Sequence, residues 1–254
     1  MHNALRLSLL GCLTAATVAA EVRIVLCECD SPPLMEFAAR HEPSGGLIKE
    51  ISDLIVHQMH DTPQYEVLSR KRIDLALAKG EADMVCFSNP AWTSLSARLQ
   101  WSTEIMPQVE KVLLDAQRAA QTQSVNDLRG MRIGLIHGFH YPALDPLIQS
   151  GQIKPVYERD PQSNFRLLEH GLVDGVVSSD LQHSHYLRTR TGGRALGLST
   201  LTVSTTPTHC AVPKASALPM DKVNTAIQQL KQQGAFDKLL QRYRALPTPT
   251  SGKP

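Results

Sequence analysis

The residues best suited to binding chemistry follow a short apolar run in the N-terminal half of the chain. Residues 82–87 are almost wholly apolar, as expected of a strand buried on both faces of a parallel sheet. Ser88, Asn89 and Pro90 end this run. In an open α/β sheet, the loops at the carboxyl ends of the strands bind ligands. The sequence therefore predicts that residues 88–102 line a binding cleft, with Ser88 and Asn89 at its start.

Aromatic side chains occupy similar positions. Trp92 lies in the loop after residues 82–87, and Phe139 and Tyr141 lie in the loop after the expected strand 131–136. Aromatic faces offer stacking and cation–π contacts to a ring or a cationic group. We therefore expect Trp92, Phe139 and Tyr141 to be exposed at the cleft, whereas Trp101 is expected to pack in the core.

Charged candidates come from the loops after the first two expected strands. Asp30 and Glu36 follow the strand expected at residues 22–29, and either carboxylate could hold a cationic solute, be solvated or cap a turn. Arg70 and Arg72 follow the strand expected at 65–68, and Arg70 is expected to lie nearer the cleft.

Histidines raise the question of a metal site. His183 and His185 have a spacing that a metal could use, while His137 and His140 come from a separate loop. We therefore expect surface or hydrogen-bonded histidines, no metal and no cofactor.

The elements that position these residues alternate between strand and helix. Glycines and prolines punctuate the pattern, and a glycine ends the helix before residues 82–87. Strands are expected at 22–29, 65–68, 82–87, 110–114, 131–136, 153–157, 173–177 and 208–212; helices are expected at 47–60, 72–79, 142–150 and 162–170, with a helical turn at 124–128 and a pair of helices over 221–243 interrupted at Gly234. Two such α/β halves predict two lobes with a cleft between them.

The N-terminal residues predict export. Residues 1–20 carry one positive charge, an apolar run from residue 7 to 18 and small residues before the expected cleavage site. This pattern is typical of a secretory signal peptide; the alternative is a lipoprotein signal ending at Cys12. We expect lobe 1 at 21–112 and 206–246, lobe 2 at 113–205 and a disordered tail at 247–254.

Composition and charge bear on which kinds of molecule the protein could bind. Apolar residues make up 42% of the chain and charged residues 20%, which is ordinary for a globular protein. The net charge is +2 and no run of Lys or Arg stands out, so nucleic acid is not expected as a partner.

Four cysteines remain after the expected cleavage. Cys27 and Cys29 lie on one expected strand and therefore on one face, so we expect no bond between them. Cys86 lies on a strand expected beside theirs and could bridge to one of them; the alternative is buried free thiols. A zinc site is less expected, because the sequence has no CxxC pair.

An ordered set of motifs resembles a known family, the periplasmic solute-binding proteins of the amino-acid type (solute-binding protein family 3). The resemblance covers nearly the whole mature chain and includes a Gly-to-Asp turn in each half and a Trp-Ser pair where the family usually has Phe-Ser. The segments that carry it are 31–34, 46–47, 77–83, 101–102, 128–134, 168–174 and 223–234.

The resemblance implies an α/β, two-lobed periplasmic binding protein fold of type II, with two doubly wound lobes joined by a hinge that close on a small solute. It also implies an Arg that holds the solute's carboxylate, because a guanidinium offers two parallel donors. Here Leu95 stands at that position, Pro90 stands at the position of a supporting Thr, and Arg98 is three residues further on. In lobe 2 the acidic position falls on Ser179, one residue before Asp180.

The expected function is therefore capture of a small polar or amino-acid-like solute in the periplasm, for delivery by a monomer to an ABC permease. Alternatives are ligand sensing with a membrane receptor, or an enzyme similar to cyclohexadienyl dehydratases using Glu36 or His140 with Arg98. No catalytic residue is assigned. The expected ligand-binding residues are Ser31, Glu36, Arg70, Ser88, Asn89, Trp92, Arg98, Phe139, His140, Tyr141 and Asp180.

Overall fold

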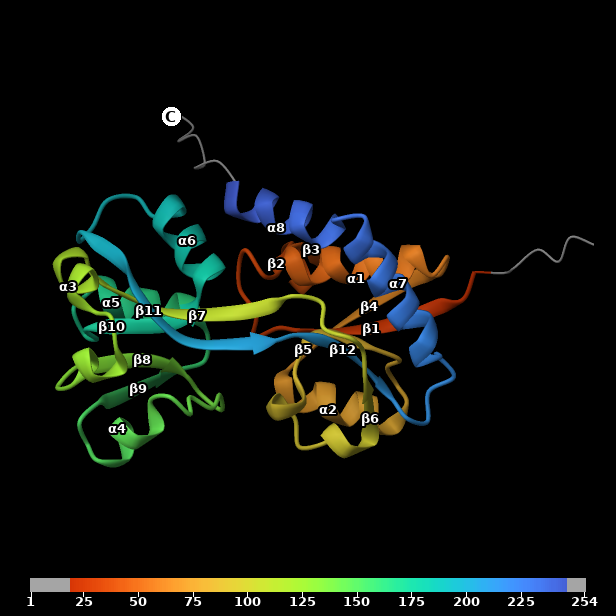
Figure 1. Cartoon of the computed structure of the whole chain (residues 1–254), viewed down its shortest axis with the longest axis horizontal. Coiled ribbons are helices and arrows are strands. Elements are labelled where there is room, and N and C mark those ends of the chain that lie inside the picture. The colour runs from red at the N-terminus through yellow and green to blue at the C-terminus, as the bar shows by residue number, and fades with distance from the viewer. Residues whose placement is uncertain (1–18, 246–254) are drawn as a thin grey trace, which may run out of the picture.

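The computed structural model describes residues 19–245 and divides into two α/β lobes that lie end to end (Figure 1). The predicted tail and all but the last two residues of the predicted signal peptide lie outside this range. Among the described residues, no helix is both long and apolar enough to cross a membrane.

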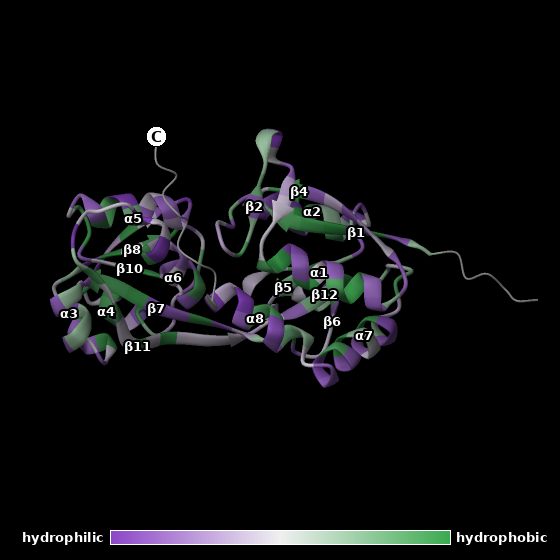
Figure 2. Cartoon of the chain, turned by 90° about the horizontal axis from the view of Figure 1, so that it is seen from above, coloured by the Kyte–Doolittle hydropathy of each residue, from purple (hydrophilic) through white to green (hydrophobic). Residues whose placement is uncertain are grey.

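Lobe 1 contains the N-terminal elements, β12 and both C-terminal helices. Its elements are β1 (Glu21–Cys27), β2 (Glu36–Phe37), η1 (Ala39–His41), β3 (Pro43–Gly45), α1 (Leu47–Gln58), β4 (Thr62–Leu68), α2 (Arg70–Lys79), β5 (Val85–Ser88), η2 (Pro90–Trp92), η3 (Ser96–Arg98), β6 (Leu99–Trp101), β12 (His209–Pro213), α7 (Met220–Gln232) and α8 (Ala235–Ala245). Figure 2 shows hydrophobic strands inside this lobe and helices with one polar side, as expected of amphipathic helices covering a core.

Lobe 2 contains the middle of the chain. Its elements are β7 (Pro107–Asp115), α3 (Ala116–Gln121), η4 (Val125–Leu128), β8 (Arg132–Ile136), α4 (Asp145–Gln149), β9 (Lys154–Glu158), α5 (Pro161–Glu169), β10 (Gly175–Ser179), α6 (Asp180–Thr189) and β11 (Leu196–Pro207). Helix α6 and the long strand β11 were not among the predicted elements.

The sheets are mixed rather than wholly parallel. In lobe 1, β1 pairs in parallel with β4, and Met84 makes a parallel bridge to Ile24. Strand β5 pairs antiparallel with β12, so the prediction of a purely parallel ladder for residues 82–87 is wrong, although their burial is confirmed. A strand that returns from lobe 2 supplies this antiparallel partner, and the local sequence carries no signal for it.

Two long strands connect the lobes. In the lobe 2 sheet, of order β11-β7-β10-β8-β9, β7 pairs antiparallel with both β10 and β11. Figure 1 shows β7 and β11 running side by side from lobe 2 into the centre of the molecule. The chain thus crosses between the lobes at both strands.

Each lobe uses the same arginine contact to fix its Gly-to-Asp turn. Arg23 near the start of β1 bonds the Asp83 carboxylate at 2.8–3.0 Å, and its Nη2 donates to Gly80 O at 2.8 Å. Arg132 at the start of β8 makes the equivalent contacts with Asp174 and with Gly171 O. The arginine joins the start of β1 to the turn before β5 in lobe 1, and the start of β8 to the turn before β10 in lobe 2.

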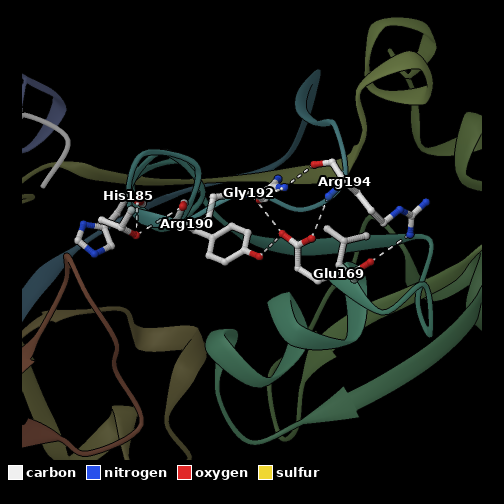
Figure 3. A network of polar contacts seen from close by, with 8 residues as sticks. Glu169, His185, Arg190, Gly192 and Arg194 are labelled. Carbon is white, nitrogen blue, oxygen red and sulfur yellow. Dashed lines mark hydrogen bonds and ion pairs between the residues drawn. The ribbon is translucent and has the colours of Figure 1, made fainter. Parts of the chain in front are cut away.

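Glu169 anchors the segment that follows α6 (Figure 3). Its carboxylate accepts a hydrogen bond from Tyr186 Oη at 2.6 Å, forms an ion pair with Arg190 at 3.1 Å and accepts from the Arg194 backbone N–H at 3.3 Å. Arg190 also donates to the backbone oxygens of Gly192 and Arg194. The C-terminal end of α6 is therefore held to α5 and moves with lobe 2.

Both disulfides differ from the predicted pairing. Cys86 bonds Cys210, and Cys27 bonds Cys29. The prediction excluded the second bond because it placed both cysteines on one strand, but β1 ends at Cys27 and Cys29 lies in the following turn. The prediction for Cys86 failed because β12, which carries Cys210, pairs directly with β5.

The two disulfides constrain the chain very differently. Cys86 and Cys210 are 124 residues apart, and a loop of that order restricts the unfolded chain by about 5 kcal/mol of free energy in the loop-entropy picture. Cys27 and Cys29 are two residues apart, so their bond removes far less entropy from the unfolded chain. The first bond therefore contributes far more to global stability than the second.

Candidate functional site

A buried hydrogen bond joins the lobes at the ends of two strands. Gln182 Nε2, near the start of α6, donates to Ser31 Oγ, in the turn after β1, at 2.8 Å. The hydroxyls of Ser178 and Ser179 donate to Gln182 Oε1 at 2.7 and 3.0 Å. Because the amide oxygen accepts from these two serines, its NH₂ group is directed toward lobe 1.

The carboxylate beside Ser31 lies in an unusual environment. Asp30 is half-buried, and burial raises the pKa of its carboxyl to about 7. The positive charge of Arg70 acts in the opposite direction and lowers this pKa in part. This carboxyl therefore titrates near neutral pH, which is unusual for Asp and is common at functional sites.

Arg70 joins this region to the loop after β5. Its Nη2 donates to Trp92 O at 2.6 Å and lies 3.8 Å from the Asp74 carboxylate. The Trp92 side chain is 37% exposed. The structure thus places Arg70 and Trp92 together beside the segment that carries Asp30, on lobe 1.

The end of β5 adopts a strained backbone. Phe87 has φ of 56°, in the left-handed region that costs a residue with a side chain roughly 1–2 kcal/mol. Such strain is often found at ligand sites. A pocket at the junction of the lobes is lined by Leu34 and Phe87 from lobe 1 and by Ser179 and Asp180 from lobe 2.

Ser88 and Asn89 follow Phe87 and are both buried. Asn89 Nδ2 donates to Pro207 O at 2.8 Å, and its Oδ1 accepts from Ala91 N–H at 2.8 Å. Asn89 therefore holds the end of β11 against lobe 1 and stabilises the hinge.

The loop after β8 presents two of its three candidates to solvent. Figure 1 shows this loop, between β8 and α4, on the side of lobe 2 that faces lobe 1. Phe139 is 42% exposed and His140 is exposed as well. Tyr141 is buried at 4% in the lobe 2 core, and its hydroxyl accepts a hydrogen bond from Ile136 N–H at 3.0 Å. The prediction that Tyr141 is exposed is wrong, because its ring closes the core under the loop.

Asp180 and Glu36 lie along a second contact between the lobes. Asp180 begins α6, where a carboxylate is favoured by the helix dipole, and lies 3.8 Å from Arg244 of α8. Arg188 of α6 donates to Tyr243 O at 3.3 Å. Glu36 is exposed on β2 and raises the pKa of His185 in part, although burial and Arg188 lower it overall.

Arg98 lies away from these residues. It ends η3, its backbone oxygen accepts from Lys214 N–H, and the next residue, Leu99, pairs with Pro213. Pro213 is at the opposite end of β12 from His209, which pairs with Ser88. Because strands rise about 3.3 Å per residue, Arg98 lies more than 10 Å along the sheet from Ser88.

Sequence reasoning missed several polar groups at the junction. Gln182 was overlooked because α6 was not predicted, and Ser178 because the expected strand ended at residue 177, one residue before it. Glu110 of β7 was assigned only to a strand, yet its carboxylate accepts from Ser204 Oγ at 2.7 Å and burial raises its pKa. Glu110 stands next to Lys111 in a strand of mixed polarity, so the local sequence gave no signal for its burial.

Among residues 19–245, one group of three potential metal-ligating side chains lies close together: the ligand atoms of Cys27, Cys29 and Asp30 are within 4.8 Å of one another. Both cysteines are in a disulfide, so neither offers a thiolate to an ion. His183 is buried against Lys111 O at 3.0 Å, and burial lowers its pKa to about 4.

The chain has a mixed α/β, two-lobed fold that matches the type II periplasmic binding proteins. No family model and no curated protein sequence matches it. It is similar in structure to an amino acid ABC transporter substrate-binding protein from Streptococcus pneumoniae bound to L-arginine, with a TM-score of 0.71 and 19% identity over 89% of this chain and 94% of that one.

Two further structures have the same fold. The ligand-binding core of GluR0 with L-glutamate has a TM-score of 0.73 and 16% identity over 91% of this chain and 100% of that one. An ancestral amino acid-binding protein described as a precursor of cyclohexadienyl dehydratase has a TM-score of 0.70 and 16% identity over 88% of this chain and 95% of that one. At these identities the comparisons establish the fold.

Proposed function

We propose that this protein is an extracytoplasmic solute-binding protein that captures a small polar or amino-acid-like solute by closure of its lobes. The observation that carries the proposal is the Ser31–Gln182 hydrogen bond, which joins the turn after β1 in lobe 1 to the start of α6 in lobe 2. Polar contacts of this kind stabilise one arrangement of two lobes relative to the other, and a ligand bound between them adds to that difference.

The charges on lobe 1 fit an amino-acid-like solute. Arg70 supplies a cation and Asp30 a carboxyl within range of its field. A zwitterionic solute carries one group of each sign, so the pair can meet both. Arg70 thus replaces Arg98 as the proposed carboxylate-binding cation, while Trp92 and Phe139 offer exposed aromatic faces.

Delivery to an ABC permease, secretion to the periplasm through a signal peptide and action as a monomer are parts of the same proposal. Each is typical of proteins with this fold. The proposed lobe boundaries are residues 21–112 with 206–246 for lobe 1 and 113–205 for lobe 2; they fall within β7 and β11, the two strands that cross between the lobes. Sensing with a membrane receptor is the alternative, and binding to a purified receptor domain rather than to a permease would distinguish it.

A thermal-shift screen of residues 21–254 against amino acids, polyamines, organic acids and aromatic metabolites tests the binding function. A solute present at 100 times its Kd stabilises the folded state by about 2.7 kcal/mol. The proposal fails if no solute raises the Tm while the protein is folded by circular dichroism.

A dehydratase is the second candidate, because the Asp30 carboxyl titrates near neutral pH and could act as a general acid. Turnover of prephenate or arogenate that is lost in Asp30→Asn would favour the enzyme. Saturable binding of a solute without turnover would favour the binding protein.

A further inference from the structure

The Cys27–Cys29 disulfide has a position that stability does not explain. It joins the last residue of β1 to the turn that leads to Ser31, and Cys29 N–H donates to Cys27 Sγ at 3.3 Å. Cys27 is 8% exposed and Cys29 is half-buried. An incoming thiol therefore has its better approach at Cys29.

The second disulfide provides an internal comparison. Cys86 is 4% exposed and Cys210 is fully buried, and their bond closes a long loop between β5 and β12. The Cys27–Cys29 bond closes a ring through a single intervening residue. Breaking it releases little chain, so the fold can survive its reduction.

The carboxylate of Asp30 lies beside the Cys27–Cys29 disulfide. One of its carboxylate oxygens lies within 4.8 Å of both sulfur atoms, which is close enough for a small side-chain rotation to bring it into hydrogen-bonding distance. Its pKa of about 7 means that at neutral pH it is present in both protonation states. Such a carboxyl can give a proton to a leaving thiolate and take one back.

We propose that Cys27–Cys29 is a thiol–disulfide exchange site that takes a dithiol as its reductant. One thiolate of the dithiol attacks Cys29 Sγ, the Sγ–Sγ bond breaks, and Cys27 leaves as a thiolate that is protonated from Asp30. The second thiol of the dithiol attacks the mixed disulfide and releases Cys29 as a thiol. The dithiol is oxidised to its disulfide, and the protein gains two electrons and two protons.

The site has a direct connection to the junction between the lobes. Ser31, which accepts the hydrogen bond from Gln182, is two residues from Cys29 and follows Asp30. Reduction removes the covalent restraint on this turn. The redox state of the cysteine pair is thereby coupled to the position of Ser31.

The test uses the full mature chain, with dithiothreitol as the dithiol. Aliquots are acid-quenched, alkylated and analysed by peptide mass spectrometry, while circular dichroism reports the fold. We expect Cys27 and Cys29 to become alkylated at least tenfold faster than Cys86 and Cys210, with the fold retained and one equivalent of dithiol oxidised. Equal rates for the two disulfides, reduction only on unfolding, or free thiols at Cys27 and Cys29 before any reductant would overturn the proposal.

Two variants separate exchange chemistry from simple exposure. Asp30→Asn should slow the reduction of Cys27–Cys29 at pH 7 at least threefold, because the leaving thiolate loses its proton donor. Glu28→Gln removes an exposed carboxylate from the same turn and should change the rate less than twofold. An unchanged rate in Asp30→Asn would overturn the assigned role of Asp30. A Cys27→Ser/Cys29→Ser chain that oxidises dithiothreitol as fast as the wild type, while Cys86 and Cys210 stay bonded, would overturn the site.

Discussion

Gln182 Nε2, in helix α6, and Ser31 Oγ, in the turn after β1, lie 2.8 Å apart although the two residues are 151 positions apart in sequence. The amide oxygen of Gln182 accepts hydrogen bonds from two serine hydroxyls of its own lobe, and its amide nitrogen donates a hydrogen bond to a serine hydroxyl of the other lobe. The direction of this bond is therefore fixed by lobe 2 before the lobes meet. A preorganised donor of this kind makes the contact between the lobes specific.

Replacing this glutamine should shift the lobes toward an open arrangement. Gln182→Ala leaves Ser31, Ser178 and Ser179 without their shared partner, which costs about 1–3 kcal/mol in the closed state. We expect a larger radius of gyration by small-angle X-ray scattering in the absence of solute. Gln152→Ala, an exposed position on the same lobe, is the control and should scatter as the wild type. Identical scattering of both variants and wild type would contradict this role.

Asp30 should make the protein less stable as pH rises. Its folded-state pKa of about 7 lies above the unfolded value of 3.8, so the folded state holds the proton more tightly. Its contribution is complete below about pH 3.8 and is lost as pH rises through 7. At pH 8, Asp30→Asn should therefore be more stable than wild type by on the order of 1–4 kcal/mol, and at pH 4 the two should agree. Urea unfolding at both pH values measures the difference.

His183 should make the folded protein less stable as pH falls, the opposite of the effect of Asp30. Burial lowers its pKa from 6.5 to about 4, so the unfolded state binds the proton more readily. The stability it contributes is complete above pH 6.5 and is lost as pH falls through 4. His183→Gln should flatten the loss of stability between pH 6.5 and 4, by up to about 3 kcal/mol. His170→Gln, an exposed control, should leave the wild-type slope unchanged.

The pattern of apolar residues predicted most helices and strands, because the spacing of apolar residues within each one reflects which of its faces is buried. Helix α1 lies at 47–58 against an expected 47–60, and β10 at 175–179 against 173–177. Helix α6 has a polar sequence, and its stability depends on Glu169 and on contacts with α8, so periodicity could not reveal it. Long-range pairing also decided the Cys86–Cys210 disulfide, because β12, which carries Cys210, pairs with β5.

The candidate site was predictable only where a loop follows a predicted strand. Ser88 ends β5, Arg70 lies two residues after β4 and Ser31 lies four residues after β1. Arg98 was chosen for its charge near a family position, but its loop continues into β6 at the far end of β12. Tyr141 was chosen for its place in a loop, although its ring turns into the core. Side-chain direction in loops depends on tertiary packing, which a local sequence does not encode.

Arg70 and Arg72 offer a matched test of the proposed cation. Both lie in the first turn of α2, but only Arg70 contacts Trp92 O and acts on Asp30, whereas Arg72 is exposed. Arg70→Met should weaken binding of any carboxylate-bearing solute found in the screen at least tenfold, by isothermal titration calorimetry. Arg72→Met should change the Kd less than twofold. Equal losses in the two variants would show only a general charge effect.

The repeated arginine contact predicts equal and independent effects in the two lobes. Asp83→Ala removes the acceptor for Arg23, and Asp174→Ala removes the acceptor for Arg132. The partners lower the pKa of both carboxyls, so each contribution is present above about pH 4 and is lost as pH falls below it. Each variant should lower the Tm by about 2–4 °C at pH 7 and by less at pH 3. Because the contacts lie in separate lobes, the double variant should show the sum, and scanning calorimetry that shows a larger loss would reveal coupling through β7 and β11.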